Sequence, residues 1–482
     1  MQIQLIIRVL GILLIIFSAT MLPPLMIAAI YGDGGGKAFF AGFFISLITG
    51  LMLFVPRKSL RGELRIRDGF LIVVLFWTVL SLFGAIPLYA SDIKGFSFAD
   101  AVFESFSGLT TTGATVIQGL DHLSHSVLFY RQQLQWLGGM GIIVLAVAIL
   151  PMLGVGGMQL YRAETPGPVK DSKLTPRIAG TAKALWYIYL GLTVACTLAY
   201  WWAGMSLFDA VSHSFSTVAI GGFSTHDASI GWFDNAQIEI ICIVFMFISG
   251  INFSLHFAAV RGLTIHPYSR DPEFRLYFSV LMFVTLLATL ILVVHEHYGF
   301  SQAFRDAAFH AVSIATTTGF ATQNFSEWPL FLPVLLLFAS FIGGCAGSTG
   351  GGMKVIRFLL LFKQGAREIK KLIHPSAIFK IRVGGNSLSE NIIEAVWGFF
   401  ATYVALFFIF MLILMADGLD QVTAFSAVAA CMNNLGPGLG EVAQNYSSLS
   451  DLSKWILSIA MLFGRLEIFT LMVLFTRDFW RS

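Results

Sequence analysis

The chain has 482 residues, of which 56% are hydrophobic and only 12% are charged. About a quarter of the residues of a soluble protein are charged, so this composition indicates an integral membrane protein. The net charge of +3 is too small to indicate a nucleic-acid partner. The four cysteines stand singly, without the spacing of a disulfide framework or a zinc site.

Ten apolar stretches are long enough to cross a bilayer, because a spanning helix needs about 20 residues. They lie at residues 9–30, 38–56, 69–90, 134–153, 184–204, 237–259, 276–295, 329–345, 393–416 and 454–476. We expect the first to be a retained helix bent near Pro23 and Pro24, because its apolar run exceeds the roughly 7–15 residues of a signal-peptide core.

Lys and Arg gather in the loops after the second, fourth, sixth and eighth stretches and in the C-terminal tail. These loops are residues 56–67, 162–183, 261–275 and 354–382. They fall on one side of the membrane if the ten stretches alternate, and positively charged loops stay in the cytoplasm. The sequence therefore predicts a multi-pass protein with both termini in the cytoplasm.

Four segments repeat one pattern around a glycine. In each, an aspartate or threonine followed by alanine stands thirteen residues before the glycine. The pairs are Asp100 and Gly113, Asp209 and Gly222, Asp306 and Gly319, and Thr423 and Gly436. The segment between them is too short to cross a bilayer, so we expect a half-helix that is capped at its start by the acid or threonine and ends before the glycine.

Non-helical backbone at membrane depth must be buried in protein or line water, so four such elements predict a pore. The expected fold is an all-α polytopic membrane protein with ten transmembrane helices. The last eight form four pseudo-fourfold repeats of membrane helix, half-helix and membrane helix around a central axis. The expected units are two N-terminal helices at 1–60 and pore repeats at 69–160, 184–262, 275–372 and 391–482.

This pattern suits a cation. Backbone carbonyls replace the oxygen contacts that an ion loses on leaving water, and glycine lets them turn toward an axis. Each half-helix C-terminus adds roughly half a negative elementary charge. Asp121, Asp227 and Glu441, beyond the glycines, are candidates for gathering cations at the outer mouth, or else are solvated loop carboxylates. We call the four glycines and the carbonyls before them the filter. Glu104, His213 and His310 stand nine residues before their glycines, and we expect them to make polar contacts behind this filter.

A second unusual stretch, GGCAGSTGGGMK at residues 343–354, falls where the third repeat should continue its last span. It is not a phosphate-binding loop, because Met353 separates the second glycine of that motif from Lys354. We expect a break in the span that lines a cavity below the filter, the alternative being a kink that serves packing.

Arg465 stands inside the last apolar stretch, where an arginine faces the protein interior or water and has partners. Arg465 follows Gly436, and the 343–352 loop follows Gly319, at similar distances along the chain. We therefore expect the two to lie at a similar depth in the membrane. We expect Arg465 to project into the pore, donate to carbonyls of that loop and raise the barrier to cations. The alternative is an ion pair with Glu467 or another neighbour.

Four strings, FESFSGLTTTGAT, AIGGFSTHD, GCAGSTGGGMKVIR and NNLGPGLG, occur in this order and resemble the Trk/Ktr/HKT superfamily of potassium transporters. Together with the two extra N-terminal spans they look like its bacterial TrkH-type membrane subunits, and the resemblance covers essentially the whole chain. It implies that each filter glycine and the two carbonyls before it bind the transported K⁺. The residues are Thr111, Thr112, Gly113, Ile220, Gly221, Gly222, Thr317, Thr318, Gly319, Asn434, Leu435 and Gly436.

The resemblance also implies that the break in the third repeat is an intramembrane gating loop. The expected gate residues are Gly343, Gly344, Gly347, Ser348, Thr349, Gly350, Gly351, Gly352, Lys354 and Arg465. The four quarters of the filter differ in sequence, so we expect K⁺ and Rb⁺ to be preferred with some Na⁺ leakage.

The implied function is potassium uptake across the bacterial inner membrane, with no organic cofactor. The implied assembly is a homodimer in the lipid bilayer with a cytosolic, nucleotide-binding TrkA-like regulatory subunit controlled by NAD or ATP. Its candidate docking surface is the loops 162–183, 261–275 and 354–382, although positive-inside bias alone explains their charge equally well.

The alternative function is a secondary transporter that couples potassium entry to protons or sodium, because such proteins also use interrupted helices. They usually show two inverted repeats, whereas four parallel units are expected here. The sequence has no H-E-x-x-H motif, no nucleophile elbow and no paired membrane acids, so we expect no enzymatic activity.

Overall fold

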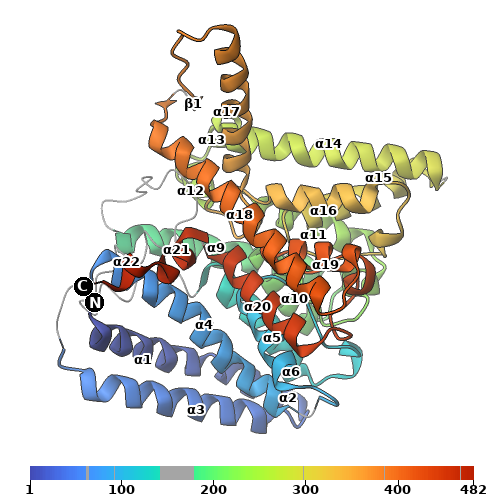
Figure 1. Cartoon of the computed structure of the whole chain (residues 1–482). Coiled ribbons are helices and arrows are strands. Elements are labelled where there is room, and N and C mark those ends of the chain that lie inside the picture. The colour runs from blue at the N-terminus through green and yellow to red at the C-terminus, as the bar shows by residue number, and fades with distance from the viewer. Residues whose placement is uncertain are drawn as a thin grey trace.

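The computed structural model describes residues 1–60, 64–91, 93–141, 178–296, 298–384, 386–466 and 468–481. Helices make up nearly all the regular structure of this part (Figure 1). A short antiparallel ribbon pairs β1 (Arg382–Val383) with β2 (Asn386–Ser387). The predicted all-α polytopic class is therefore confirmed.

Two N-terminal elements pack outside the rest of the chain. Helix α1 (Ile3–Ala19) lies against α3 (Gly36–Phe54), and a Cβ atom at Gly11 would come within 2.8 Å of the carbonyl oxygen of Gly50. Between them, α2 (Leu22–Tyr31) has prolines in its first turn. The expected bend appears as a short interruption at Thr20 and Met21, just before the prolines, because a proline ring fits only the first turn of a new helix.

Six helices within the described ranges are long and apolar enough to cross a membrane. They are Ile3–Tyr31 (α1 with α2), Gly36–Arg57 (α3 with the 3₁₀ turn η1, Val55–Arg57), Arg67–Ala90 in α4 (Ile66–Ala90), Lys183–Trp202 in α9 (Ile178–Trp202), Pro272–His295 (α14) and Glu390–Ala416 (α18). Each agrees with an apolar stretch predicted from the sequence.

Four shorter helices occupy the places of the expected half-helices: α5 (Phe98–Leu109), α10 (Leu207–Ala219), α15 (Phe300–Ala315) and α19 (Gln421–Asn433). Ser97 and Asp100 form a capping box at the start of α5, and Ser206 caps α10. Helix α15 begins one turn earlier than expected, so Asp306 lies in its second turn and does not cap it.

Of the four helices that return after the glycines, three are shorter than the sequence predicts, and the first begins before the predicted span 134–153. The four are α6 (His125–Trp136), α11 (Ala236–Ser249), α16 (Leu332–Ile342) and α20 (Asp451–Arg465). Helix α6 continues into the π-helical turn η3 (Leu137–Gly141), and the remainder of the predicted span 134–153 lies outside the described residues.

The predicted continuous spans 237–259 and 454–476 are wrong, because each is interrupted, whereas the break expected at 343–352 is present. Helices α11 and α12 (Phe253–Gly262) meet at 96°, and the Asn252 side chain caps the new helix by accepting the Ser254 N–H. Helix α16 ends at Ile342 and α17 (Val355–Ile373) begins after the glycine-rich loop. Helices α20 and α21 (Ile468–Met472) differ in direction by 117°.

The remaining elements are short. One 3₁₀ turn follows each filter glycine: η2 (Leu120–His122), η4 (Ser229–Phe233), η5 (Phe325–Glu327) and η6 (Gly440–Val442). Helix α13 (His266–Arg270) precedes α14, and the chain ends with η7 (Val473–Phe475) and α22 (Arg477–Trp480).

Helix packing arranges these elements in a cycle. Each half-helix packs against the long helix before it: α5 on α4, α10 on α9, α15 on α14 and α19 on α18. It also packs against the return helix of the preceding segment: α10 on α6, α15 on α11, α19 on α16 and α5 on α20. The buried ion pair of Lys454 with Asp100, 2.6 Å long, lies at the last of these contacts. The first and last segments are therefore neighbours.

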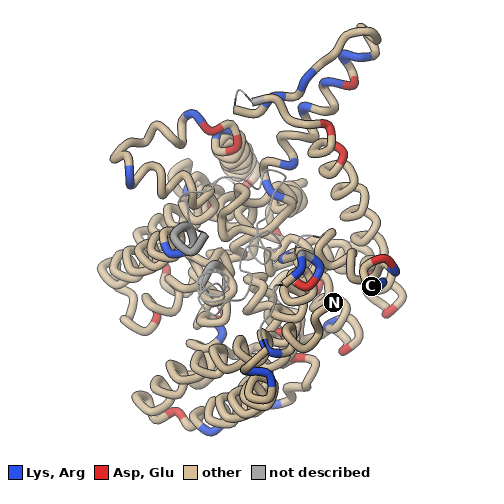
Figure 2. Tube along the Cα trace, turned by 90° about the vertical axis from the view of Figure 1, so that its left-hand side faces the viewer, with Lys and Arg blue, Asp and Glu red and all other residues tan. Residues whose placement is uncertain are grey.

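The charged residues lie mainly at helix ends and in loops, while most of each long helix is uncharged (Figure 2). Helix α17, the β-ribbon and the start of α18 project beyond the rest of the molecule, and several Lys and Arg follow this projection (Figures 1 and 2). The N- and C-terminal ends lie close together.

Candidate functional site

The four half-helices end in the same backbone conformation. Two residues before each glycine stands a non-glycine residue with positive φ: Thr111 (55°), Ile220 (54°), Thr317 (72°) and Asn434 (54°). The N–H of the next residue donates to a carbonyl five residues back, as in Thr112 to Ser107 (2.8 Å). This is a Schellman cap, in which glycine is usual at the left-handed position. Because side chains disfavour that conformation, the surrounding structure must impose it.

The four glycines predicted to form the filter connect the four segments into a closed ring. A Cβ atom at each one would collide with a carbonyl oxygen of the following segment. The distances would be 2.1 Å from Gly113 to Gly221, 2.0 Å from Gly222 to Thr318, 2.1 Å from Gly319 to Leu435 and 2.8 Å from Gly436 to Thr112. The glycines also have φ between 81° and 95°, so both the conformation and the close approach require glycine.

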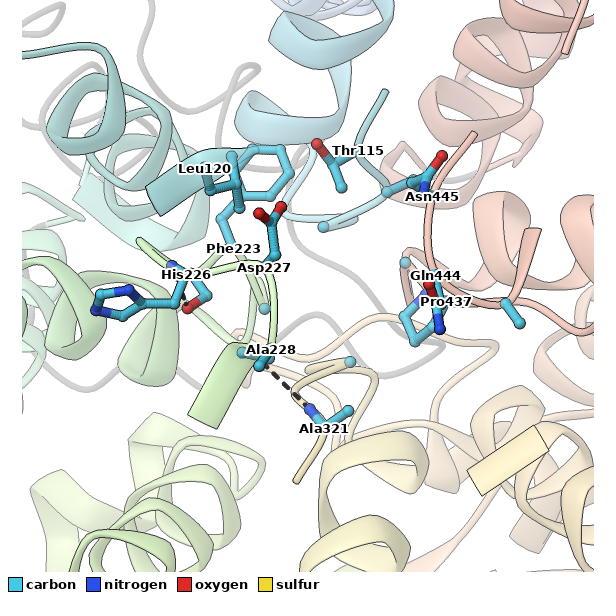
Figure 3. A pocket seen from close by; sticks show the side chains of 18 of the residues that line it. Thr115, Leu120, Phe223, His226, Asp227, Ala228, Ala321, Pro437, Gln444 and Asn445 are labelled. Atoms are coloured by element: carbon cyan, nitrogen blue, oxygen red, sulfur yellow. Dashed lines mark hydrogen bonds between the residues drawn. The ribbon is translucent and has the colours of Figure 1, made fainter. Parts of the chain in front are cut away.

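A cavity of about 680 Å³ lies on the outer side of this ring, and all four segments line it (Figure 3). Its wall includes the four glycines of the ring together with the residues that follow them. The predicted filter residues are therefore brought together by the fold, although they span more than 300 positions of the chain.

The three acids proposed for the outer mouth are placed differently. Asp227 lines the cavity and accepts a hydrogen bond from the Gly119 N–H at 3.1 Å. Asp121 pairs with His226 at 2.5 Å, so its charge is partly balanced. Glu441 is exposed in η6 and is not among the cavity-lining residues. Of the three, only Asp227 is in direct contact with the cavity.

His226 joins the first and second segments at the outer surface. Its ring stacks on Trp232 at 3.7 Å and lies between the carboxylates of Asp121 (2.5 Å) and Asp209 (3.6 Å). Figure 3 shows it pointing away from the centre of the ring. Burial lowers the pKa of His226, but hydrogen bonds to Asp209 and Asp121 and their charges outweigh this and raise the pKa above its usual value.

Behind the first segment lies a buried ion pair. Arg131 of α6 and Glu104 of α5 are 2.7 Å apart, with side chains that are 1% and 0% exposed. Glu104 also accepts the Val116 N–H at 3.0 Å, and Arg131 donates to the Ser224 carbonyl of the second segment at 3.1 Å. The pair therefore ties two neighbouring segments together.

Histidines occupy the equivalent place in the second and third segments. The Nε2 atom of His213 lies 2.9 Å from the Ser224 hydroxyl, and that of His310 lies 3.2 Å from the Gln323 carbonyl. The polar contacts expected of Glu104, His213 and His310 are confirmed, and they lie behind the ring of glycines.

Two glutamines of α6, which our sequence reasoning missed, hold the second segment. Gln135 donates to the Gly221 carbonyl at 2.6 Å and accepts the Phe223 N–H at 3.0 Å, while Gln132 donates to the Phe223 carbonyl at 3.0 Å. The signal was present in the string RQQLQ at 131–135, because so many polar residues in a membrane helix must face the protein interior.

Below the ring, the loop between α16 and α17, residues 343–354, contacts the ends of three half-helices. The contacts are Thr349 Oγ1 to the Val218 carbonyl (2.9 Å), Gly351 N to Thr317 Oγ1 (2.7 Å) and Gly352 N to the Asn433 carbonyl (2.9 Å). The loop thus lies directly beneath the ring of glycines, where the half-helix dipoles point.

The other predicted gate residues shape the same loop. Gly343, Gly347 and Gly352 all have φ above 70°. Ser348 donates to the Cys345 carbonyl, and the Lys354 ammonium donates to that of Gly350. The Gly344 carbonyl accepts the Val355 N–H that begins α17.

The break between α11 and α12 supports the loop from its side. The Gly250 carbonyl accepts the Cys345 N–H at 2.9 Å, and the Gly347 carbonyl accepts the Phe253 N–H at 2.9 Å. This contact explains the unexpected interruption of span 237–259, since a continuous helix would have kept the Gly250 carbonyl for its own hydrogen bonds.

Arg465, at the end of α20, reaches the loop. Its guanidinium donates to the Thr349 carbonyl at 3.2 Å and to Thr111 Oγ1 at 3.0 Å. It also donates to the carbonyls of Gly138 (2.6 Å) and Gly139 (2.9 Å) at the end of the first segment. The expected contact between Arg465 and the loop is therefore present. Glu467, the partner in the alternative interpretation, lies outside the described residues.

Comparison with known proteins places this architecture in a family. The profile of the TrkH family, described as cation transport proteins, matches residues 35–481. The chain is 60% identical over 485 residues to the Trk system potassium uptake protein TrkH of Vibrio parahaemolyticus, with 100% of both chains covered. It is 58% identical over 483 residues to TrkH of Escherichia coli K12, again with 100% of both covered.

A third relative, the Trk system potassium uptake protein TrkG of Escherichia coli K12, is 43% identical over 98% of this chain and 97% of its own. The fold matches a crystal structure of the potassium transporter TrkH from Vibrio parahaemolyticus with a TM-score of 0.91, at 57% identity and 100% coverage of both chains. The chain belongs to the TrkH family of cation transport proteins.

Proposed function

We propose that this chain takes up potassium across the bacterial inner membrane through a channel-like pore, with the glycine ring as its filter. The observation that carries this proposal is the closure of the ring, in which each filter glycine abuts a carbonyl of the next segment. The names of the relatives, as potassium uptake proteins, supply the ion.

In this mechanism K⁺ sheds water at the outer cavity and takes up carbonyl oxygens of the glycines and of the two residues before each glycine. These ligands carry no net charge, so the ion is held without being trapped. The four half-helix C-termini, each worth roughly half a negative charge, favour a cation in the space below. The segments have different sequences, so K⁺ and Rb⁺ are preferred while Na⁺ leaks through.

The loop 343–354 with Arg465 forms the closed gate. Thr349, Gly351 and Gly352 direct donors at the half-helix ends, which are the acceptors that a cation would need there. Arg465 adds a fixed positive charge at the same level, and like charges repel strongly where water is scarce. Opening the pore requires these contacts to break.

The functional assembly is a homodimer in the bilayer, with both termini in the cytoplasm. A cytosolic nucleotide-binding subunit, TrkA-like and controlled by NAD or ATP, docks on the basic face. The described part of that face comprises residues 261–275 and the projection at 354–382, and the loop 162–177 lies outside the described residues. The names of the relatives support a multi-component system, because they refer to a Trk system.

Flux through purified protein in liposomes tests the proposal, with K⁺, Rb⁺ and Na⁺ compared. Gly113→Ser should lower the K⁺/Na⁺ flux ratio, because its Cβ would meet the Gly221 oxygen at 2.1 Å. Gly119→Ser is a matched control: its φ of 73° imposes similar strain, but no atom lies within 4 Å of an added Cβ.

An unchanged ratio in Gly113→Ser would overturn the filter assignment. Flux that requires a proton or sodium gradient would instead favour a secondary transporter, the alternative in which potassium entry is coupled to protons or sodium.

A further inference from the structure

A buried carboxylate outside the filter touches both ends of the loop 343–354. Glu273 lies in the first turn of α14 and is only 7% exposed. Its Oε1 atom accepts the Ala346 N–H at 2.7 Å and the Ile356 N–H at 3.1 Å. These two residues bracket the part of the loop that reaches the half-helix ends.

The contact with Ile356 completes the start of α17. The first N–H groups of any helix have no partner within the helix and need an outside acceptor. Lys354, at the N-cap position of α17, makes no side-chain cap, and its φ is 78°. Glu273 supplies the missing acceptor from a different helix, and a carboxylate is favoured at the positive end of the helix dipole.

The contact with Ala346 fixes the other end of the loop. One oxygen atom therefore sets the separation between Ala346 and Ile356, and the residues between them reach the half-helix ends. Burying a carboxylate is costly unless charge and hydrogen bonds compensate, so this arrangement is specific to the observed loop position.

We propose that Glu273 is a positioning residue that holds the loop closed beneath the filter. The inference rests on the proposed gating function of that loop. Glu273 directly follows the basic segment 261–272, which includes α13 and faces the cytoplasm in the proposed topology. A partner that moves this segment would pull Oε1 away from both N–H groups and release the two ends of the loop together.

The test measures basal Rb⁺ flux of the full chain in liposomes for Glu273→Ala and Glu273→Gln. The alanine variant should raise basal flux about tenfold, equivalent to about 1.4 kcal/mol, because it removes both acceptor contacts. The glutamine variant keeps an amide oxygen that can accept both N–H groups. Its basal flux should therefore be much closer to that of the native chain than to that of the alanine variant. Glu296→Gln, an exposed acid at the other end of α14, is the matched control and should not change flux.

A second readout follows the loop itself. In protein whose native cysteines are replaced by alanine, Ser348→Cys is labelled with a charged thiol reagent from the cytoplasmic side. Labelling should be faster with Glu273→Ala than with the native carboxylate. Amide hydrogen exchange of peptides containing Ala346 and Ile356 should quicken in the same variant. It should quicken to a smaller extent in Glu273→Gln, because a neutral amide oxygen accepts more weakly than a carboxylate, and this smaller rise is the test if the alanine variant does not fold.

The outcomes separate this inference from the gating function, with Arg465→Ala measured in parallel. If Arg465→Ala raises flux but Glu273→Ala changes neither flux, labelling nor exchange, Glu273 is not the positioning residue and the gate stands. If Glu273→Ala speeds labelling and exchange while neither variant changes flux, the positioning role stands and the loop is not the gate.

Discussion

The carboxylate of Glu104 and the guanidinium of Arg131 form a fully buried ion pair, 2.7 Å long, immediately behind the first segment of the glycine ring. Arg131 also stacks on the Phe223 ring, 4.2 Å from its centroid, and donates to the Ser224 carbonyl. One arginine therefore links the α5 half-helix to the backbone that follows the second filter glycine. Each of its roles has a measurable consequence.

Replacing Arg131 by methionine should destabilise the protein strongly. Removing one partner of a buried ion pair typically costs about 3–5 kcal/mol, because the other charge is left buried and uncompensated. We expect a marked fall in the thermal midpoint measured in detergent. The double variant Glu104→Gln with Arg131→Met should recover part of the loss, since no uncompensated charge remains. A double variant no more stable than Arg131→Met would contradict this account.

Replacing Gln135 by leucine should affect the filter more than the fold. The lost amide holds the Gly221 carbonyl and the Phe223 N–H, and an unsatisfied buried group costs about 1–3 kcal/mol. We expect the K⁺/Na⁺ flux ratio to fall, because Gly221 is then free to turn. Gln133→Leu, on the same helix, loses only its bond to Thr20 and should leave the ratio unchanged. If the K⁺/Na⁺ flux ratio of Gln135→Leu equals that of Gln133→Leu, Gln135 does not shape the filter.

The half-helices and the ring were accessible to sequence reasoning because local signals determine them. A half-helix of about a dozen residues cannot cross a bilayer, and the spacing of Asp100 and Gly113 recurs in the other segments. The one-turn extension of α15 was not accessible, since its added residues fit a helix as well as a loop.

The interruptions of the return helices depend on tertiary contacts that hydropathy does not record. Residues 237–259 are apolar enough to continue as a helix, yet the Gly250 carbonyl accepts Cys345 from another segment and Asn252 caps a new helix. The contacts of Glu273 are likewise invisible, because its two partners lie more than 70 positions away. Local patterns therefore predict the elements, and long-range hydrogen bonds decide where they break.

Replacing Arg465 by alanine should raise basal Rb⁺ flux in liposomes. The change removes a positive charge from below the filter and releases the Thr349 carbonyl of the loop. We expect an increase on the order of tenfold, or about 1.4 kcal/mol of barrier. Arg465→Lys keeps the charge but cannot reproduce four separate contacts. Its flux should therefore lie between that of the native chain and that of Arg465→Ala. Arg477→Ala, at the exposed C-terminal end, is the control, and an Arg465→Ala flux equal to it would argue against a gate.

His226 should make the stability of the outer surface depend on pH. Its pKa is raised in the folded protein, because the hydrogen bonds and charges of Asp209 and Asp121 outweigh the effect of burial. His213, stacked 6.5 Å away, is the other titratable ring that faces it. A raised folded pKa means that protonated His226 stabilises the fold fully below its unfolded pKa, near 6.5, and that this contribution disappears as the pH rises through the folded pKa. The thermal midpoint of the native chain should therefore exceed that of His226→Gln most at about pH 5–6, and the difference should shrink toward about pH 8–9. A difference for His226→Gln that is constant over this range would mean that the two carboxylates do not hold the charged ring.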